Sequence, residues 1–276
     1  MLSGQVSVST DATIAAGVTV SVAPGTELSM DEGVTLRVKG TLEVLGSDTD
    51  RVTMHPSTGA LTPNDLLDFA WSGIIVESGG SARLSKVDGS GVATLLYCEA
   101  GAVRCDLEGV NFNTVGNFVI AEAPTMIVGS SVETLGTISL RGGSLTIIDS
   151  RIFNSNHDII VASGGDLVID HSEIGGAMGS YEHCNLHIGS ASSVMVTNSN
   201  ITSAVYGLMI GGVTGAVFSN NNFTLNESAD VLEVGSVSDV KMSGNYWDGG
   251  APAGLGNSYD VGAALASPVA DAGPRL

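Results

Sequence analysis

An aspartate and a histidine occupy equivalent positions in two consecutive sequence repeats. Asp149 follows the segment SLTII and His171 follows DLVID, so a 22-residue repeat places one directly above the other. A carboxylate beside an imidazole is an arrangement that general acid–base catalysis uses. Asn198 and Asn220 continue the same column, however, and short polar residues at the corners of a strand repeat bond the neighbouring backbone. We therefore predict no catalytic residue, with Asp149 and His171 as the candidates if the chain is an enzyme.

A second group of reactive side chains lies in the longest repeat. Its 27-residue interval inserts Gly-Ala-Met-Gly-Ser-Tyr-Glu-His-Cys before the strand pattern of residues 185–188. Aligning Ile159 with Leu186 places His157 in register with Cys184, and His183 and Glu182 adjoin them. Two imidazoles, a thiolate and a carboxylate could bind Zn²⁺. Because no established metal-spacing motif is present, the sequence predicts no bound metal, and His157, His183 and Cys184 are the candidate ligands.

Calcium has a separate candidate in the Asp-x-Asp segment formed by Asp48 and Asp50. Carboxylate oxygens in a turn are suitable Ca²⁺ ligands. A lone pair of this kind is more often a solvated turn, so we predict no resident cofactor. Ca²⁺ and Zn²⁺ are the ions that these groups would bind.

The remaining cysteines, Cys98 and Cys105, align with Ile120 and Ile127 of the next repeat, which face inward. We expect both to be buried. A separation of seven residues permits a disulfide without requiring it, so the two side chains are either small apolar fillers or a corner disulfide.

An internal repeat must position all of these residues. From about residue 102 to 247 each copy has a short apolar-x-apolar strand, a small polar corner, a further apolar residue, a loop and a second strand. The apolar residues after the corner form one column: Val110, Val132, Ile152, Ile174, Ile201, Phe223 and Trp247. Two residues earlier is a second column: Glu108, Ser130, Ser150, Ser172, Ser199, Asn221 and Asn245. Such a Ser and Asn column is expected to be structural.

The alternation within each copy is the period of a β-strand, and a repeat of about 22 residues is too short for two packed helices. Stacked copies can bury their apolar residues together. We predict an all-β fold, a right-handed parallel β-helix of about 10–11 coils, over residues 1–250. Residues 57–70 interrupt it as a loop with a short helix, and residues 251–276 form a cap and a frayed tail.

Two segments carry a family resemblance. GVTVSVAPGTELSMDEGVTLRVKGTLEVLGS followed by WSGIIVESGG, and SGNYWDGG with SPVADAG, resemble the start and finish of right-handed parallel β-helix domains in bacterial surface and secreted proteins. This is the pectate-lyase-like fold group, and the resemblance covers nearly the whole chain. It implies an extracellular or cell-surface location, with a secretion signal lying outside these 276 residues.

The lyases of that group use Ca²⁺ and an Arg or Lys base. Between Cys105 and Lys241 the only basic residues are Arg141 and Arg151, and the repeat pairs Arg151 with Glu173. The sequence therefore favours a non-catalytic module, a rigid scaffold or adhesive face for glycans or proteins. The alternatives are a polysaccharide lyase or glycoside hydrolase, and a self-assembling structural protein. We expect a monomer or end-to-end self-association.

The overall charge narrows the range of partners. Twenty-nine acidic and ten basic residues give a formal charge of −19, which repels nucleic acid and anionic lipids. No apolar run reaches the roughly 18 residues that span a bilayer. We expect no nucleic-acid partner and no membrane insertion.

Overall fold

The computed structural model describes residues 1–59, 70–134, 136–154, 157–177 and 183–275. Within these ranges the secondary structure is all β, and the strands pair in parallel as a β-solenoid of about 10 turns. This confirms the predicted fold class. No helix among these residues has the length and apolar character needed to cross a membrane. The short helix predicted within residues 57–70 falls on residues 60–69, which lie outside the described residues.

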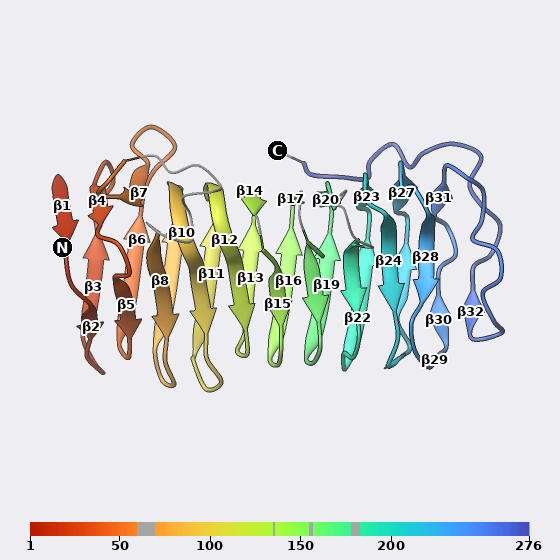
Figure 1. Cartoon of the computed structure of the whole chain (residues 1–276), viewed down its shortest axis with the longest axis horizontal. Helices are drawn as coiled ribbons and strands as arrows, with labels where there is room; N and C mark the ends of the chain where they lie inside the picture. Colours follow the sequence, from red (N-terminus) through yellow and green to blue (C-terminus); the bar gives the residue numbers. More distant parts are fainter. Residues whose placement is uncertain (60–69, 135, 155–156, 178–182, 276) are drawn as a thin grey trace. The chain divides into compact units, whose positions relative to one another are not determined.

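The chain divides into two compact units, Met1–Ile138 and Ser139–Leu276, and the boundary falls within β15 (Ile138–Leu140). In each unit one coil supplies a strand to each of three series, so successive coils pair edge to edge (Figure 1). We call the two parts the N-terminal and the C-terminal unit.

The N-terminal unit contains three strand series. The first is β1 (Gln5–Val8), β4 (Glu27–Met30), β7 (Val52–Pro56), β10 (Val87–Cys98), β12 (Asn111–Ala121) and β14 (Ser131–Thr134). The second is β2 (Ala12–Ile14), β5 (Thr35–Val38) and β8 (Trp71–Val76), continued by the long strands β10 and β12. The third is β3 (Thr19–Val22), β6 (Thr41–Leu45), β9 (Ser81–Ser85), β11 (Arg104–Glu108) and β13 (Thr125–Val128).

The C-terminal unit repeats this arrangement. One series is β16 (Ser144–Ile148), β19 (Asp166–Asp170), β22 (Ser193–Thr197), β26 (Val217–Ser219), β30 (Val240–Lys241) and β32 (Tyr259–Asp260). The next is β17 (Arg151–Asn154), β20 (Glu173–Gly175), β23 (Asn200–Thr202), β27 (Asn222–Thr224) and β31 (Tyr246–Trp247). The last is β18 (Ile160–Ala162), β21 (Cys184–Ile188), β24 (Tyr206–Ile210) and β28 (Ala229–Glu233). A small additional pair is β25 (Val213–Thr214) with β29 (Val237–Ser238).

Apolar side chains stack in columns inside each unit. In the C-terminal unit one fully buried column runs through paired residues of β16, β19, β22 and β26: Ile147, Ile169, Val196 and Phe218. The predicted anchor column is also present, and its last two rings, Phe223 and Trp247, stack at 4.4 Å between centroids. Each column stabilises the fold by burying like residues on successive coils.

A buried polar ladder runs beside these columns at one corner of the C-terminal unit. The Ser150 amide donates to Ser172 Oγ at 3.2 Å, the Ser172 amide to Ser199 Oγ at 3.1 Å, and the Ser199 amide to Asn221 Oδ1 at 2.9 Å. The backbone amide of Asn221 continues the series by donating to Asn245 Oδ1 at 2.8 Å. We call these five residues the polar ladder. The predicted structural role of the Ser and Asn column is therefore confirmed.

The first member of the predicted anchor column is wrong. Phe112 pairs with Val132, so Val110 occupies the position before Ser130 and its amide donates to Ser130 Oγ at 3.2 Å. Val110 is buried as completely as a true anchor, so apolar character did not distinguish it from Phe112. The interval to Val132 is therefore 20 residues (132 minus 112) instead of 22.

Cys98 and Cys105 are both fully buried, as expected, and they form a disulfide. Their predicted alignment is wrong: Cys98 pairs with Ala121 and Cys105 with Thr125. The same two-residue difference in coil length that displaces Val110 also displaces Cys105.

The end of the chain is ordered against the C-terminal unit instead of frayed. After β32 it runs back past β31, β27 and β23 (Figure 1). Val269 exchanges two hydrogen bonds with the Asn222 side chain, and the Gly273 amide donates to the Asn198 carbonyl at 2.8 Å. Arg275 then reaches Asp149. We call residues 265–275 the C-terminal strap.

Candidate functional site

The register between β18 and β21 decides which side chains meet in this part of the C-terminal unit. β18 pairs with β21 so that Ile160 lies beside Leu186, and the same register places Asp158 beside Cys184. The predicted alignment of Ile159 with Leu186, which put His157 beside Cys184, is wrong by one residue. Ile159 and Ile160 are both fully buried, so hydrophobicity alone favours neither alignment.

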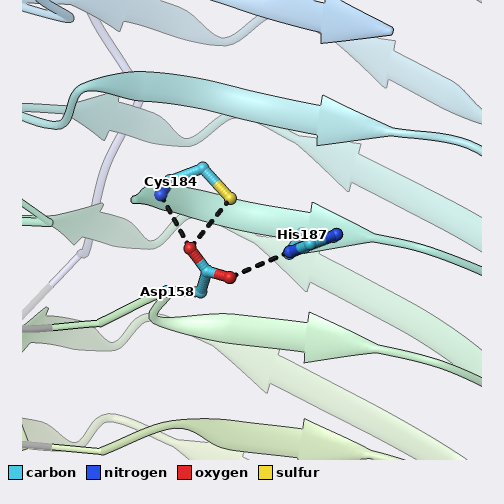
Figure 2. A group of neighbouring side chains, drawn as sticks. All are labelled: Asp158, Cys184 and His187. Carbon is cyan, nitrogen blue, oxygen red and sulfur yellow. Dashed lines mark hydrogen bonds and ion pairs between the residues drawn. The ribbon is translucent and has the colours of Figure 1, made fainter. Parts of the chain in front are cut away.

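Asp158 forms the centre of a compact cluster with Cys184 and His187 (Figure 2). The Cys184 amide donates to Asp158 Oδ1 at 2.9 Å, and the Cys184 thiol donates to the same oxygen at 3.4 Å. The other carboxylate oxygen, Oδ2, pairs with His187 Nδ1 at 2.9 Å. One donor atom from each of the three side chains lies within 4.8 Å of the others. We call these three residues the Asp–Cys–His cluster.

Two more histidines border this cluster. His183 Nδ1 lies 3.5 Å from Asp158 Oδ1, and the His183 ring meets His157 edge-on at 5.1 Å between centroids. Of the candidate metal ligands, Cys184 thus belongs to the cluster, His183 lies at its border, and His157 contacts only that bordering ring in the interactions described. Glu182 lies outside the described residues.

Sequence reasoning did not place Asp158 or His187 among the candidate metal ligands. His187 alternates with the buried Leu186 and Ile188, so the strand period alone places it on the opposite face from those two residues. Asp158 is placed beside Cys184 only when the register is shifted by one residue. The signal for His187 was therefore in the sequence, whereas that for Asp158 required the correct pairing.

The carboxyl of Asp158 is held ionised. Burial alone would raise its pKa, but hydrogen bonds from His187 and from the amide and thiol of Cys184 outweigh burial and lower the pKa to about 2. The hydrogen bond to Asp158 raises the pKa of His187, against the opposing effect of burial. An ionised carboxylate paired with an imidazole is thus the ground state of this cluster.

The Cys184 thiol is held protonated. Burial raises the pKa of Cys184 far above its ordinary range, and the negative charge of Asp158 adds to the effect. Because the thiolate is the nucleophilic form, this cysteine lacks the electropositive surroundings of a reactive one. The arrangement offers sulfur, nitrogen and oxygen donors rather than an activated nucleophile.

The other candidate pair, Asp149 and His171, is occupied by separate partners. Both residues have left-handed backbones, with φ of 48° and 44°, as corner residues of successive coils. Arg275 donates to both oxygens of Asp149, at 2.7 and 2.9 Å. His171 Nδ1 instead pairs with Asp170 Oδ2 at 2.9 Å.

These contacts favour the ionised form of the Asp149 carboxyl group. The hydrogen bonds from Arg275 lower the pKa of Asp149. Asp170 also accepts bonds from Thr197 and Asn198, at 2.7 and 2.8 Å. The described contacts include no hydrogen bond between Asp149 and His171. Instead, Asp149 pairs with Arg275, and Asp170 pairs with His171 and accepts hydrogen bonds from its other neighbours.

The calcium candidate is likewise engaged locally. Asp48 forms an ion pair with Lys86 at 2.7 Å, and Asp50 accepts a hydrogen bond from Thr49 at 2.8 Å. The ion pair predicted between Arg151 and Glu173 is confirmed, at 3.2 Å.

The fold and these contacts define a parallel β-solenoid protein with a mixed Asp–Cys–His cluster between two successive coils of its C-terminal unit. No protein-family model matches the chain, and no curated protein is significantly similar to it.

Proposed function

We propose that the chain is a non-catalytic β-solenoid module of a bacterial cell-surface or secreted protein. In this role it is a rigid scaffold with a face that adheres to glycans or to other proteins. The observation that carries the proposal is the polar ladder, whose side chains are buried and bonded to backbone amides from coil to coil. Polar groups used in this way stiffen the unit and are not exposed to a substrate.

The carboxylates of the C-terminal unit support a non-catalytic role. Glycoside hydrolases need two carboxyl groups about 5–9.5 Å apart that face one bond, and one of them must be a proton donor. Asp149, Asp158 and Asp170 are each bound by other side chains of the fold. The low pKa of Asp158, about 2, also makes it a poor general acid near neutral pH.

The burial of the aromatic side chains and the overall charge indicate which kind of partner the module would bind. Phe118, Phe218, Phe223 and Trp247, which could serve as stacking platforms for sugars, are buried. Contact with a glycan would therefore be mainly polar. The charge of −19 favours neutral sugars or cationic protein surfaces over uronates and other polyanions.

A screen against pectate, alginate and neutral glycans, with Ca²⁺ and Zn²⁺ supplied, tests the proposal. We expect no new reducing ends and no unsaturated products with any of them. Turnover that Asp149→Asn or His183→Ala abolishes, with thermal unfolding unchanged, would overturn it. Asp271→Asn, which removes an exposed carboxylate, is the matched control.

The disulfide supports the proposed export. Disulfides persist in oxidising compartments and are rare in the cytosol, and Cys98 is bonded to Cys105 while Cys184 is free. Alkylation of the denatured, unreduced protein is expected to modify only Cys184. Mass spectrometry that finds all three cysteines modified would remove this support.

A further inference from the structure

We propose that the Asp–Cys–His cluster is a Zn²⁺ site, with Asp158, Cys184 and His187 as ligands. The site is independent of the scaffold role and goes beyond it. It rests on the kinds of donor atoms present, on their spacing and on how the solenoid holds them.

The donor set selects the class of metal. Thiolate sulfur and imidazole nitrogen suit Zn²⁺, whereas Ca²⁺ and Mg²⁺ prefer oxygen ligands alone. One sulfur, one nitrogen and one carboxylate lie within 4.8 Å of one another. The cluster is therefore suited to zinc, and to tetrahedral Co²⁺ as its spectroscopic substitute.

The spacing also suits a small ion. Zinc–ligand bonds of about 2.0–2.3 Å in a tetrahedron place neighbouring donor atoms roughly 3.3–3.8 Å apart. Cys184 Sγ already lies 3.4 Å from Asp158 Oδ1. His187 Nδ1 lies 2.9 Å from Oδ2, so this pair must separate by less than an ångström on the same estimate. His183 Nδ1, 3.5 Å from Oδ1, is a further nitrogen donor beside the cluster.

The fold orients the ligands before any metal binds. Cys184 and His187 lie on one strand, β21, which is paired on both sides by β18 and β24. The Cys184 amide also donates to Asp158 Oδ1 and so fixes the carboxylate, as outer-shell contacts do in metal sites. Cys184 is buried, but the side chains of Asp158 and His187 are 20% and 33% exposed, which leaves a solvent-facing side for entry.

Binding exchanges a proton for the metal. The sulfur–hydrogen bond of Cys184 breaks, a sulfur–zinc bond forms, and the proton passes to solvent. His187 gives up the Nδ1 proton that it donates to Asp158 and takes up one at Nε2 from solvent, so the neutral ring binds through Nδ1 and the net release is the thiol proton. The hydrogen bonds that Asp158 now accepts from the thiol and the imidazole are replaced by coordination, so no oxidant or reductant is required.

Titration of the chelator-treated full chain with Co²⁺ tests the site. We expect one Co²⁺ per chain, with a thiolate-to-cobalt charge-transfer band in the near ultraviolet, tetrahedral bands in the visible, and displacement of both by Zn²⁺. Ca²⁺ should not displace the cobalt.

Three variants assign the ligands. Cys184→Ser should abolish the charge-transfer band. Asp158→Asn and His187→Ala should each weaken Zn²⁺ binding roughly 100-fold or more, because even outer-shell losses cost about 10–100-fold. His55→Ala is the matched control, since His55 Nε2 pairs with Glu27 Oε1 at 3.0 Å in the N-terminal unit, and it should bind as the parent does.

Folding of each variant is verified by its thermal unfolding without metal, and Zn²⁺ should raise the unfolding temperature of the parent and His55→Ala only. A missing charge-transfer band, or undiminished binding by Cys184→Ser, would overturn the site. Neither result affects the scaffold proposal, which the glycan screen tests separately.

Discussion

Eight non-glycine residues among those described have left-handed backbones, and Leu225 is the least suited to one. Its φ is 56° and it is 68% exposed, so it gains little from burial. Asparagine tolerates this conformation better than leucine. We expect Leu225→Asn to raise the free energy of unfolding by about 0.5–1 kcal/mol in urea denaturation.

Leu225→Val is the control for this prediction, because a β-branched residue is the poorest choice at positive φ. The hydrogen bond from the Leu225 amide to Asp248 Oδ2, at 2.6 Å, is retained by either substitution. Equal stability of the two variants would show that backbone strain at this corner is negligible.

Asp230 makes stability depend on pH. Burial raises its pKa to about 6, although Asn226 donates a hydrogen bond that favours the ionised form, and the charge of Asp248 raises it further. The unfolded pKa is about 3.9, so the folded state binds the proton more tightly. The stabilisation is complete below about pH 4 and is lost as the pH rises through about 6.

We therefore expect Asp230→Asn, which is uncharged at every pH, to be more stable than the parent near pH 7. This advantage should shrink as the pH falls from about 6 to about 4. Urea unfolding across that range measures it. Asp239→Asn, at an exposed site, controls for the change in net charge, and identical pH profiles for the two variants would contradict the prediction.

Two adjacent residues of strand β22 face opposite sides of the strand and should differ in their tolerance of a charge. On β22, Val196 is fully buried in an apolar column and Met195 is 46% exposed. A carboxylate has no partner in that column, so Val196→Asp should cost several kcal/mol or prevent folding. Met195→Asp should change the free energy of unfolding by about 0.5 kcal/mol or less. Equal melting temperatures would contradict the observed register.

The repeat alone predicted most of the architecture. Where a Ser or Asn precedes a single buried residue by two positions, as before Ile174 and Ile201, the sequence placed the column correctly. A polar corner and one apolar neighbour leave only one register compatible with burial. The fold class follows from this pattern repeated along the chain.

The candidate site could not be predicted in the same way. A one-residue slip moves every side chain of a strand to the other face. Ile159 and Ile160 are both buried, so the sequence did not distinguish two registers, and the choice between them decides whether His157 or Asp158 meets Cys184. Coil lengths also vary, and the rule of an apolar residue after the corner selected Val110 where Phe112 pairs with Val132. The hydrogen bonds between coils determine both registers, and a local sequence pattern does not contain this information.

At the scale of the chain, the few basic side chains mainly form ion pairs with acidic side chains of the same chain. Within the described residues, eight of the ten form ion pairs: Arg37, Lys39, Arg51, Lys86, Arg83, Arg104, Arg151 and Arg275. The cations are thus largely used within the fold, and the excess of acidic over basic residues, a formal charge of −19, repels anions. This balance, rather than any one residue, disfavours a polyanionic substrate.

The C-terminal strap links several coils of the C-terminal unit. Four hydrogen bonds join Val269, Ala272 and Gly273 to three asparagines of two successive coils, Asn198, Asn200 and Asn222, in addition to the pair between Arg275 and Asp149. A chain ending at Ser267 loses all of them. Hydrogen bonds contribute about 0.5–1.5 kcal/mol each, and ordering the strap costs entropy, so we expect a net loss of about 1–3 kcal/mol.

Glycine substitutions test the strap without shortening the chain. Gly273 has φ 103°, and a Cβ there would lie 2.6 Å from Asn200 Nδ2, so Gly273→Ala should detach the strap. Gly249→Ala, where the added Cβ meets open space, is the control. Gly273→Ala and the truncated chain should both melt at lower temperature and exchange the amide protons near Asn200 and Asn222 faster. If Gly273→Ala matches Gly249→Ala in both measurements, the strap does not stabilise the coils over which it lies.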